Sequence, residues 1–286
     1  MKKIALAMLF ATVSIFAKVN AVVSILPQKT FVEAIGGEHV KVTTMVLPGH
    51  EPHSYEPKPS QMKVLSDADI YFSIGVEFEN SWLDKFRSQN KNMLMVDSAK
   101  GIKRMKMSAH HHEEESNKNK EHNDHSGLDP HVWLSPSNVK IIAKNIYDAL
   151  IKADPNNQSD YQKGYEEFFS KIDKTDKQIK EILKDVKPKS KFLVFHPAFG
   201  YFAREYDLVQ VPIQTEGKEP KPRELIHIIK EAKQDNVKAI FVEPEFSDKS
   251  AKIIANEIGV KVIKFSPLNP NWSQNLIKIA KAIAGK

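Results

Sequence analysis

The stretch DPNNQSDYQKGYEEFFSKIDKTDKQIKEILKDV, from Asp154 to Val186, determines how the rest of the chain is organised. Its apolar residues recur every three or four positions, as on one face of an amphipathic helix. They are Tyr161, Tyr165, Phe168, Ile172, Ile179, Leu183 and Val186. A helix of ~30 residues is roughly 45 Å long, enough to run along two domains. Since Lys187-Pro188 ends the pattern, we expect one linking helix over residues 154–187.

Short apolar runs alternate with helical patterns on both sides of this helix. The runs that we expect to be strands are 19–28, 40–49, 69–76 and 91–99 before it, and 191–197, 208–214, 237–244 and 260–267 after it. Strands that alternate with helices favour an α/β fold with mainly parallel sheets. We therefore predict two lobes, residues 18–153 and 188–286, each a mainly parallel sheet with flanking helices, joined by one long rigid helix.

A polar stretch without apolar periodicity, residues 103–127, interrupts the first lobe, and we expect a disordered loop there. It carries His110, His111, His112, His122 and His125 among several acidic residues. Histidine-rich tracts bind Zn, Cu or Ni, and acidic neighbours raise the local cation concentration. A collector or sensor of metal is one hypothesis for this loop, and a solvated, dispensable loop is the other.

The N-terminal residues MKKIALAMLFATVSIFA have the basic start, apolar run and small final residue of a secretory signal peptide, residues 1–17. The apolar run is shorter than the roughly 18 residues that span a membrane. Lys18 follows, and the chain has no cysteine to carry a lipid anchor or to ligate a metal. We expect a soluble protein in the periplasm of a Gram-negative cell.

The formal net charge of +6 comes from lysines that are spread along helical faces. Nucleic-acid binding favours a basic stripe interleaved with aromatic residues, and the chain shows no such stripe. We therefore expect no nucleic-acid partner.

Three histidines lie far apart in proline- or glycine-marked segments that follow expected strands: His53 in GHEPHSYEPKPS, His131 in DPHVWLSP and His196 in VFHPAFGYF. Ligands of open α/β sheets gather beyond the carboxyl ends of the strands, and domain interfaces often hold small-ligand sites. Imidazoles suit Zn, Cu, Fe and Ni. Each histidine taken singly is more often a loop or core residue, so the spacing leaves both a shared metal site and ordinary structural roles open.

Four motifs in this order, GHEPHSYEPKPSQ, LDPHVWLSP, VFHPAFGYFA and FVEPEFS, resemble the ZnuA-like zinc branch of the metal-binding proteins that serve ABC importers. The resemblance covers essentially all of the chain after residue 17. It implies two α/β lobes bridged by a long helix, with the metal between them and His53, His131 and His196 as its ligands. Manganese-type relatives carry a carboxylate at the third position, so His196 indicates zinc.

The resemblance is weaker at the fourth ligand. Relatives often carry an aspartate in a segment similar to SPLNP, where this chain has Asn269. We expect a water molecule, or a weak contact from Asn269, to complete the coordination. Glu243 and Glu245 are nearby acidic candidates, for which we expect a surface role or a role in supporting the ligands.

The resemblance therefore implies a high-affinity periplasmic zinc-binding protein that captures Zn²⁺ and delivers it to the membrane permease of an ABC transporter. We expect a monomer without enzymatic activity. A manganese or iron solute-binding protein is the alternative within the same class. A three-histidine zinc hydrolase or hydratase is another alternative, although no acid–base or nucleophile motif accompanies the histidines. An adhesive role at the cell surface is the last, and the lack of a lipid-anchor cysteine argues against it.

Overall fold

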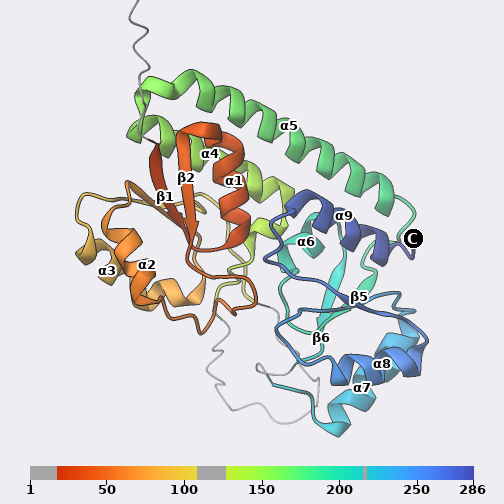
Figure 1. Cartoon of the computed structure of the whole chain (residues 1–286). Coiled ribbons are helices and arrows are strands. Elements are labelled where there is room, and N and C mark those ends of the chain that lie inside the picture. Colours follow the sequence, from red (N-terminus) through yellow and green to blue (C-terminus); the bar gives the residue numbers. More distant parts are fainter. Residues whose placement is uncertain (1–17, 108–126, 215–217) are drawn as a thin grey trace, which may run out of the picture.

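The structure, a computed structural model, describes residues 18–107, 127–214 and 218–286. The described residues form two α/β lobes with one long helix running along both (Figure 1). The predicted signal peptide and the five histidines of the run 110–125 lie outside the described residues.

The N-terminal lobe is built on a parallel sheet with the strand order β2-β1-β3-β4. Its strands are β1 (Val19–Val23), β2 (Val40–Thr44), β3 (Ile70–Ser73) and β4 (Leu94–Asp97). Its helices are α1 (Leu26–Gly36), α2 (Pro59–Ser66), α3 (Glu77–Gln89) and α4 (Pro136–Ala153), with short 3-10 turns at Gly37–His39 and Val132–Leu134. All four strands run the same way, so the loops that follow them collect at one edge of the sheet.

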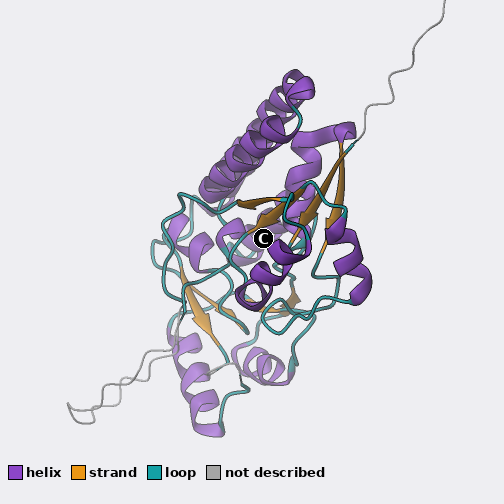
Figure 2. Ribbon diagram, turned by 90° about the vertical axis from the view of Figure 1, so that its left-hand side faces the viewer, coloured by secondary structure: helices purple, strands orange, loops and turns teal. Residues whose placement is uncertain are grey.

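The C-terminal lobe repeats this plan with the strand order β6-β5-β7-β8, again all parallel. Its strands are β5 (Lys191–Val194), β6 (Val209–Pro212), β7 (Ile240–Val242) and β8 (Val262–Lys264). Its helices are α6 (Gly200–Glu205), α7 (Pro222–Gln234), α8 (Lys249–Ile258) and α9 (Trp272–Ile283). Helices flank the strands of both lobes (Figure 2). The predicted fold class, two parallel-sheet α/β lobes with a long helix, is confirmed.

The linking helix is α5 (Gln158–Leu183), which packs on α1 and α4 of the first lobe and on α9 of the second. It is 26 residues long, shorter than the predicted segment, because Pro155–Asn157 form a separate 3-10 turn before it. Asp154 accepts hydrogen bonds from the Asn157 amide and the Tyr161 hydroxyl, at 2.7 and 2.8 Å, which stabilises this turn.

Two element boundaries differ from the sequence prediction. The first strand ends at Val23, and residues 26–28, which were expected to continue it, begin α1. Pro27 fits the first turn of a helix, where its missing N–H costs nothing. The Gln28 side chain also accepts hydrogen bonds from the backbone N–H groups of Ser24 and Ile25, at 3.0 and 3.2 Å.

The second difference concerns the ends of the predicted loop 103–127. Lys106 pairs with Leu128 in an antiparallel bridge, and the Met107 N–H donates to the Gly127 carbonyl over 3.2 Å. The ordered backbone therefore extends to Met107, five residues into the predicted loop, because these backbone groups satisfy one another.

Tryptophan side chains join the two lobes directly. The Trp133 indole N–H donates to the Pro267 carbonyl over 2.8 Å, and the Trp272 indole N–H donates to the Trp133 carbonyl over 2.6 Å. Both rings are buried in a hydrophobic core that includes residues of both lobes. The lobes are therefore held together by packing and by directed hydrogen bonds as well as by α5. Within the described residues, no helix is both long and apolar enough to cross a membrane.

Candidate metal centre

His53 lies in the loop between β2 and α2, in a turn that Glu51 stabilises. The two Glu51 carboxylate oxygens accept from the backbone N–H groups of His53 and Ser54, at 3.0 and 3.2 Å. The His53 imidazole is partly buried, and its Nδ1 lies 2.5 Å from a carboxylate oxygen of Glu77, at the start of α3. This contact holds the Nδ1 hydrogen and leaves Nε2 facing the space between the lobes.

His131 lies between β4 and α4, where it precedes the 3-10 turn at Val132–Leu134. Asp129 Oδ1 accepts from the His131 backbone N–H at 2.9 Å and lies 2.8 Å from Nδ1 of its ring. Both side chains are buried. The Tyr201 hydroxyl donates to the Asp129 carbonyl over 2.9 Å, so a residue of the other lobe supports this segment.

His196 lies two residues after the last residue of β5 and is the only one of the three that the C-terminal lobe supplies. Its Nδ1 lies 2.8 Å from the Gln214 side-chain nitrogen. The Phe246 ring stacks on the imidazole, with 5.6 Å between the centroids and 27° between the planes. Hydrogen bond and stacking together limit how the ring can turn.

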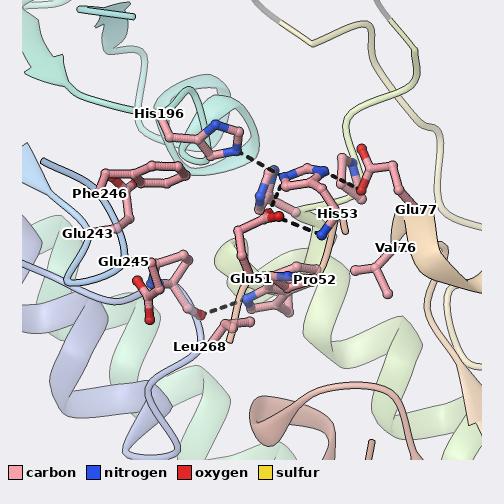
Figure 3. A pocket seen from close by; sticks show the side chains of 14 residues that line it. Glu51, Pro52, His53, Val76, Glu77, His196, Glu243, Glu245, Phe246 and Leu268 are labelled. Atoms are coloured by element: carbon pink, nitrogen blue, oxygen red, sulfur yellow. Dashed lines mark hydrogen bonds and ion pairs between the residues drawn. The ribbon is translucent and has the colours of Figure 1, made fainter. Parts of the chain in front are cut away.

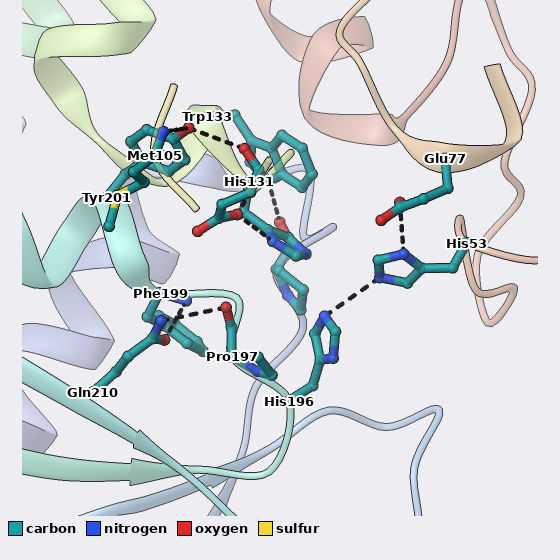
Figure 4. A network of polar contacts seen from close by, with 12 residues as sticks. His53, Glu77, Met105, His131, Trp133, His196, Pro197, Phe199, Tyr201 and Gln210 are labelled. Atoms are coloured by element: carbon teal, nitrogen blue, oxygen red, sulfur yellow. Dashed lines mark hydrogen bonds and ion pairs between the residues drawn. The ribbon is translucent and has the colours of Figure 1, made fainter. Parts of the chain in front are cut away.

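The three imidazoles meet at one point between the lobes (Figure 4). One ligand atom from each of His53, His131 and His196 lies within 4.8 Å of the other two. The Nε2 atoms of His53 and His196 are 3.3 Å apart. Two nitrogens that ligate tetrahedral zinc at roughly 2.0–2.1 Å are about 3.3 Å apart. The spacing therefore fits a zinc-sized cation without rearrangement of this pair.

The pKa values of two of these histidines shift in opposite directions. Burial opposes protonation of His53, but the hydrogen bond and charge of Glu77, helped by Glu51 and Asp129, outweigh it and hold its pKa above the ordinary value. Burial, followed by the neighbouring imidazoles, holds the pKa of His196 well below its ordinary value. His196 is therefore neutral over the physiological range, as a metal ligand must be.

Several buried oxygens around this point lack partners. Among the described residues, Asp129 Oδ2, Gln214 Oε1 and both carboxylate oxygens of Glu243 are buried without a hydrogen bond. Unsatisfied buried polar atoms are uncommon and often mark a site for an ion or water. Glu243 lines the same pocket as the three histidines (Figure 3), and burial raises its pKa to about 8.

The other predicted candidates occupy different positions. Glu245 also lines the pocket. Asn269 is not among the residues that line it: its Oδ1 accepts from the Asn271 N–H at 2.9 Å, and its amide nitrogen faces Asn275 at 3.4 Å. The Asn269 side chain is thus engaged by Asn271 in its own turn and by Asn275 on α9.

Sequence reasoning missed the residues that hold the imidazoles: Glu51, Glu77, Asp129, Gln214 and Phe246. One signal was available, because Glu51-Pro52-His53 and Asp129-Pro130-His131 share an acid–proline–histidine pattern. In both, the acid accepts a hydrogen bond from the backbone N–H of the histidine. No comparable local signal marks Glu77 or Gln214, which lie 24 and 18 residues from the histidines that they contact.

Known proteins resemble this chain over nearly its whole length. A family profile described as zinc-uptake complex component A, periplasmic (ZnuA), matches residues 21–285. The chain is 34% identical over 263 residues to the zinc-binding protein AdcA of Streptococcus pyogenes serotype M3 (88% of this chain, 50% of AdcA). It is 35% identical over 251 residues to the high-affinity zinc uptake system protein ZnuA of Bacillus subtilis strain 168 (85% of this chain, 76% of that protein).

Solved structures agree with these relatives. A crystal structure of ZnuA superimposes with a TM-score of 0.83 at 40% identity, covering 93% of this chain and 98% of that one. The chain spans about half the length of AdcA.

Proposed function

The chain belongs to the family of periplasmic zinc-uptake complex component A proteins, and from this premise we propose that it binds one Zn²⁺ between its lobes through His53, His131 and His196. The observation that carries the proposal is the convergence of three imidazoles, each with its Nδ1 engaged by another side chain. Such partners fix the orientation of metal-binding histidines in known sites. The match between the 3.3 Å Nε2–Nε2 distance and a tetrahedral edge supports the same reading.

The ligand chemistry favours zinc over manganese or iron(II). Neutral imidazoles suit zinc, whereas manganese prefers carboxylates and other oxygens. The third position, His196, is an imidazole here, and it cannot provide the charge that a carboxylate would. A competition titration in which Mn²⁺ displaced Zn²⁺ would support the manganese alternative instead.

For the fourth position we propose Glu51 or a water molecule ahead of Asn269. A Glu51 carboxylate oxygen lies 3.3 Å from His53 Nε2, the nitrogen that faces His196. Asn269 would first have to give up its contacts with Asn271 and Asn275. Glu243 remains a candidate to support the site, because its buried carboxylate lines the same pocket.

We further propose that the protein acts outside the cytoplasmic membrane as a monomer and hands its zinc to the permease of an ABC importer. Its family and its named relatives support a transport role in place of catalysis. A zinc hydrolase would need a base beside a metal-bound water, and a turnover assay with zinc-loaded protein would reveal one. We propose the histidine-rich run 110–125 as an auxiliary metal collector.

The test is a competition titration with zinc and a chelator of known affinity. The starting chain carries asparagine at His110, His111, His112, His122 and His125, so that only the proposed site is measured. His196→Ala in this chain should lose the tight equivalent, whereas His227→Ala, an exposed histidine on α7, should keep it. Tight binding that survived His196→Ala would contradict the proposed site. Zinc uptake by cells that depend on this chain should fail with the same variant.

A further inference from the structure

Gln214 is positioned beside His196 by the backbone of the C-terminal sheet. The pairing of β5 with β6 continues past both strands: the Ile213 N–H donates to the Val194 carbonyl over 2.8 Å, and the Gln214 N–H donates to the Phe195 carbonyl over 3.1 Å. His196 follows Phe195 in the sequence, so the side chains of His196 and Gln214 lie next to each other. Each is only 8% exposed, and their contact is thus shielded from water.

The orientation of the Gln214 amide determines where the His196 ring carries its hydrogen. The amide nitrogen, which can only donate, lies 2.8 Å from Nδ1. Nδ1 must therefore accept, and a neutral ring then carries its hydrogen on Nε2. Gln214 Oε1, the acceptor of the same amide, is buried without a hydrogen-bond partner among the described residues.

The contact with His53 agrees with this tautomer. His53 Nδ1 donates to the Glu77 carboxylate at 2.5 Å, so Nε2 of a neutral His53 is an acceptor. It lies 3.3 Å from His196 Nε2, a distance that an Nε2 hydrogen of His196 would bridge. A Glu51 carboxylate oxygen lies at the same distance from this His53 nitrogen. Close polar contacts thus run from Glu77 through His53 and His196 to Gln214.

A metal needs the opposite arrangement at His196. Zinc binds an unprotonated ring nitrogen, and the hydrogen then sits on the other nitrogen. His53 and His131 already meet this condition, since Glu77 and Asp129 hold their Nδ1 hydrogens. His196 meets this condition only if its hydrogen moves from Nε2 to Nδ1. At Nδ1 the hydrogen would face the Gln214 amide nitrogen, which is itself a donor.

We propose that Gln214 is a positioning residue whose amide makes a half-turn when zinc binds, so that its Oε1 accepts a hydrogen bond from Nδ1 of His196 and Nε2 is freed for the metal. The inference rests on the proposed function. One proton leaves Nε2 to water and one is taken up at Nδ1, so the charge of the ring does not change. The turn also gives the buried Oε1 the partner that it lacks.

The spectroscopic test follows the histidine tautomers by long-range ¹H–¹⁵N correlation in the full chain, without metal and with one equivalent of zinc. We expect His196 to carry its hydrogen on Nε2 before zinc is added and on Nδ1 afterwards. His53 and His131 should carry theirs on Nδ1 in both states. A His196 ring that carries its hydrogen on Nδ1 before zinc is added would overturn the inference.

Two substitutions test the same inference by affinity. Gln214→Leu keeps the size but removes the acceptor, and it should weaken zinc binding by about 10- to 100-fold, the usual effect of removing such a partner. Gln214→Glu offers only acceptors, so it should retain at least the wild-type affinity and show the Nδ1 hydrogen on His196 before zinc is added. Unchanged affinity in Gln214→Leu would overturn the inference.

A parallel titration of His196→Ala separates the two proposals. If His196→Ala abolishes tight binding while Gln214→Leu has no effect, the proposed zinc site stands and only the role of Gln214 is wrong. If tight binding survives His196→Ala, the proposed site and the inference both fail.

Discussion

The two lobes contribute unequal halves to the site. The N-terminal lobe supplies two imidazoles, and a carboxylate holds each of them: Glu77 for His53 and Asp129 for His131. The C-terminal lobe supplies one imidazole, His196, held by the neutral amide of Gln214. The N-terminal half therefore carries the negative charge of two carboxylates that attracts a cation, whereas the partner of the buried His196 in the C-terminal half is neutral.

This difference has a consequence for how a cation is bound. Anionic partners raise the basicity of the imidazoles that they hold, so the N-terminal half should supply most of the attraction for Zn²⁺. His196, without a carboxylate partner, is the weaker donor. A ligand of this kind suits the release of the metal that we propose.

Among the groups that hold the imidazoles, the largest effect should come from removing the buried carboxylate of the N-terminal half. Asp129→Asn keeps the shape but removes the charge beside His131, and we expect zinc affinity to fall by about 10- to 100-fold. Glu77→Gln should cost less, because the Glu77 side chain is 40% exposed and Asp129 is 0% exposed, and water screens exposed charges. Chelator competition measures both.

Glu167→Gln, an exposed change on α5, is the matched control and should leave the affinity unchanged. Equal losses of zinc affinity in the Asp129 and Glu77 variants would contradict the expectation that a buried carboxylate contributes more than an exposed one.

Lower pH should weaken zinc binding through the N-terminal half first. Protons compete with the metal for imidazole, and the pKa of His53 lies above its ordinary value whereas that of His196 lies well below it. Affinity should therefore decrease as pH falls through the raised pKa of His53, by up to about tenfold per pH unit for one competing proton. Titrations between pH 8 and pH 5 measure this.

Glu77→Gln sharpens the pH comparison, because Glu77 is the main group that raises the pKa of His53. Its loss should move the onset of the decrease to lower pH. An affinity that stayed constant from pH 8 to pH 5 would contradict an all-imidazole site.

The smallest effect should come from Gly200, where the C-terminal lobe meets Asp129. A Cβ at this position would lie 2.7 Å from Asp129 Oδ2 and 3.2 Å from the Gln210 amide nitrogen. Gly200→Ala should therefore push Asp129 away and weaken zinc binding by less than about tenfold, with an overpacking cost of about 1–3 kcal/mol in stability. Gly127→Ala, which meets no atom within 4 Å, is the control. A Gly200→Ala variant with wild-type affinity would show that Asp129 tolerates displacement.

Much of the fold could be predicted from the sequence, because its signals are local. The apolar stripe of α5 and the alternation of strands and helices appear as periodic patterns within short windows. Boundaries were harder: Leu26 begins a helix because the Gln28 side chain caps it, and an apolar run beside a strand does not reveal that.

The meeting of the three histidines depends on contacts far apart in the chain. The sequence placed each histidine after a strand, and the resemblance to a family selected them as ligands. The groups that orient them, Glu77 and Gln214, belong to other loops and are brought close only by sheet order and lobe packing. No local sequence pattern marks Glu77 or Gln214, so the sequence could not predict their roles.

The most direct test of three imidazoles from two lobes on one cation is zinc X-ray absorption spectroscopy. The sample is the chain with asparagine at the five histidines of the run 110–125, loaded with half an equivalent of zinc. We predict three imidazole nitrogens at about 2.0–2.1 Å, and two in the His196→Ala variant. A spectrum with two or fewer imidazoles in the parent chain would contradict the proposed site.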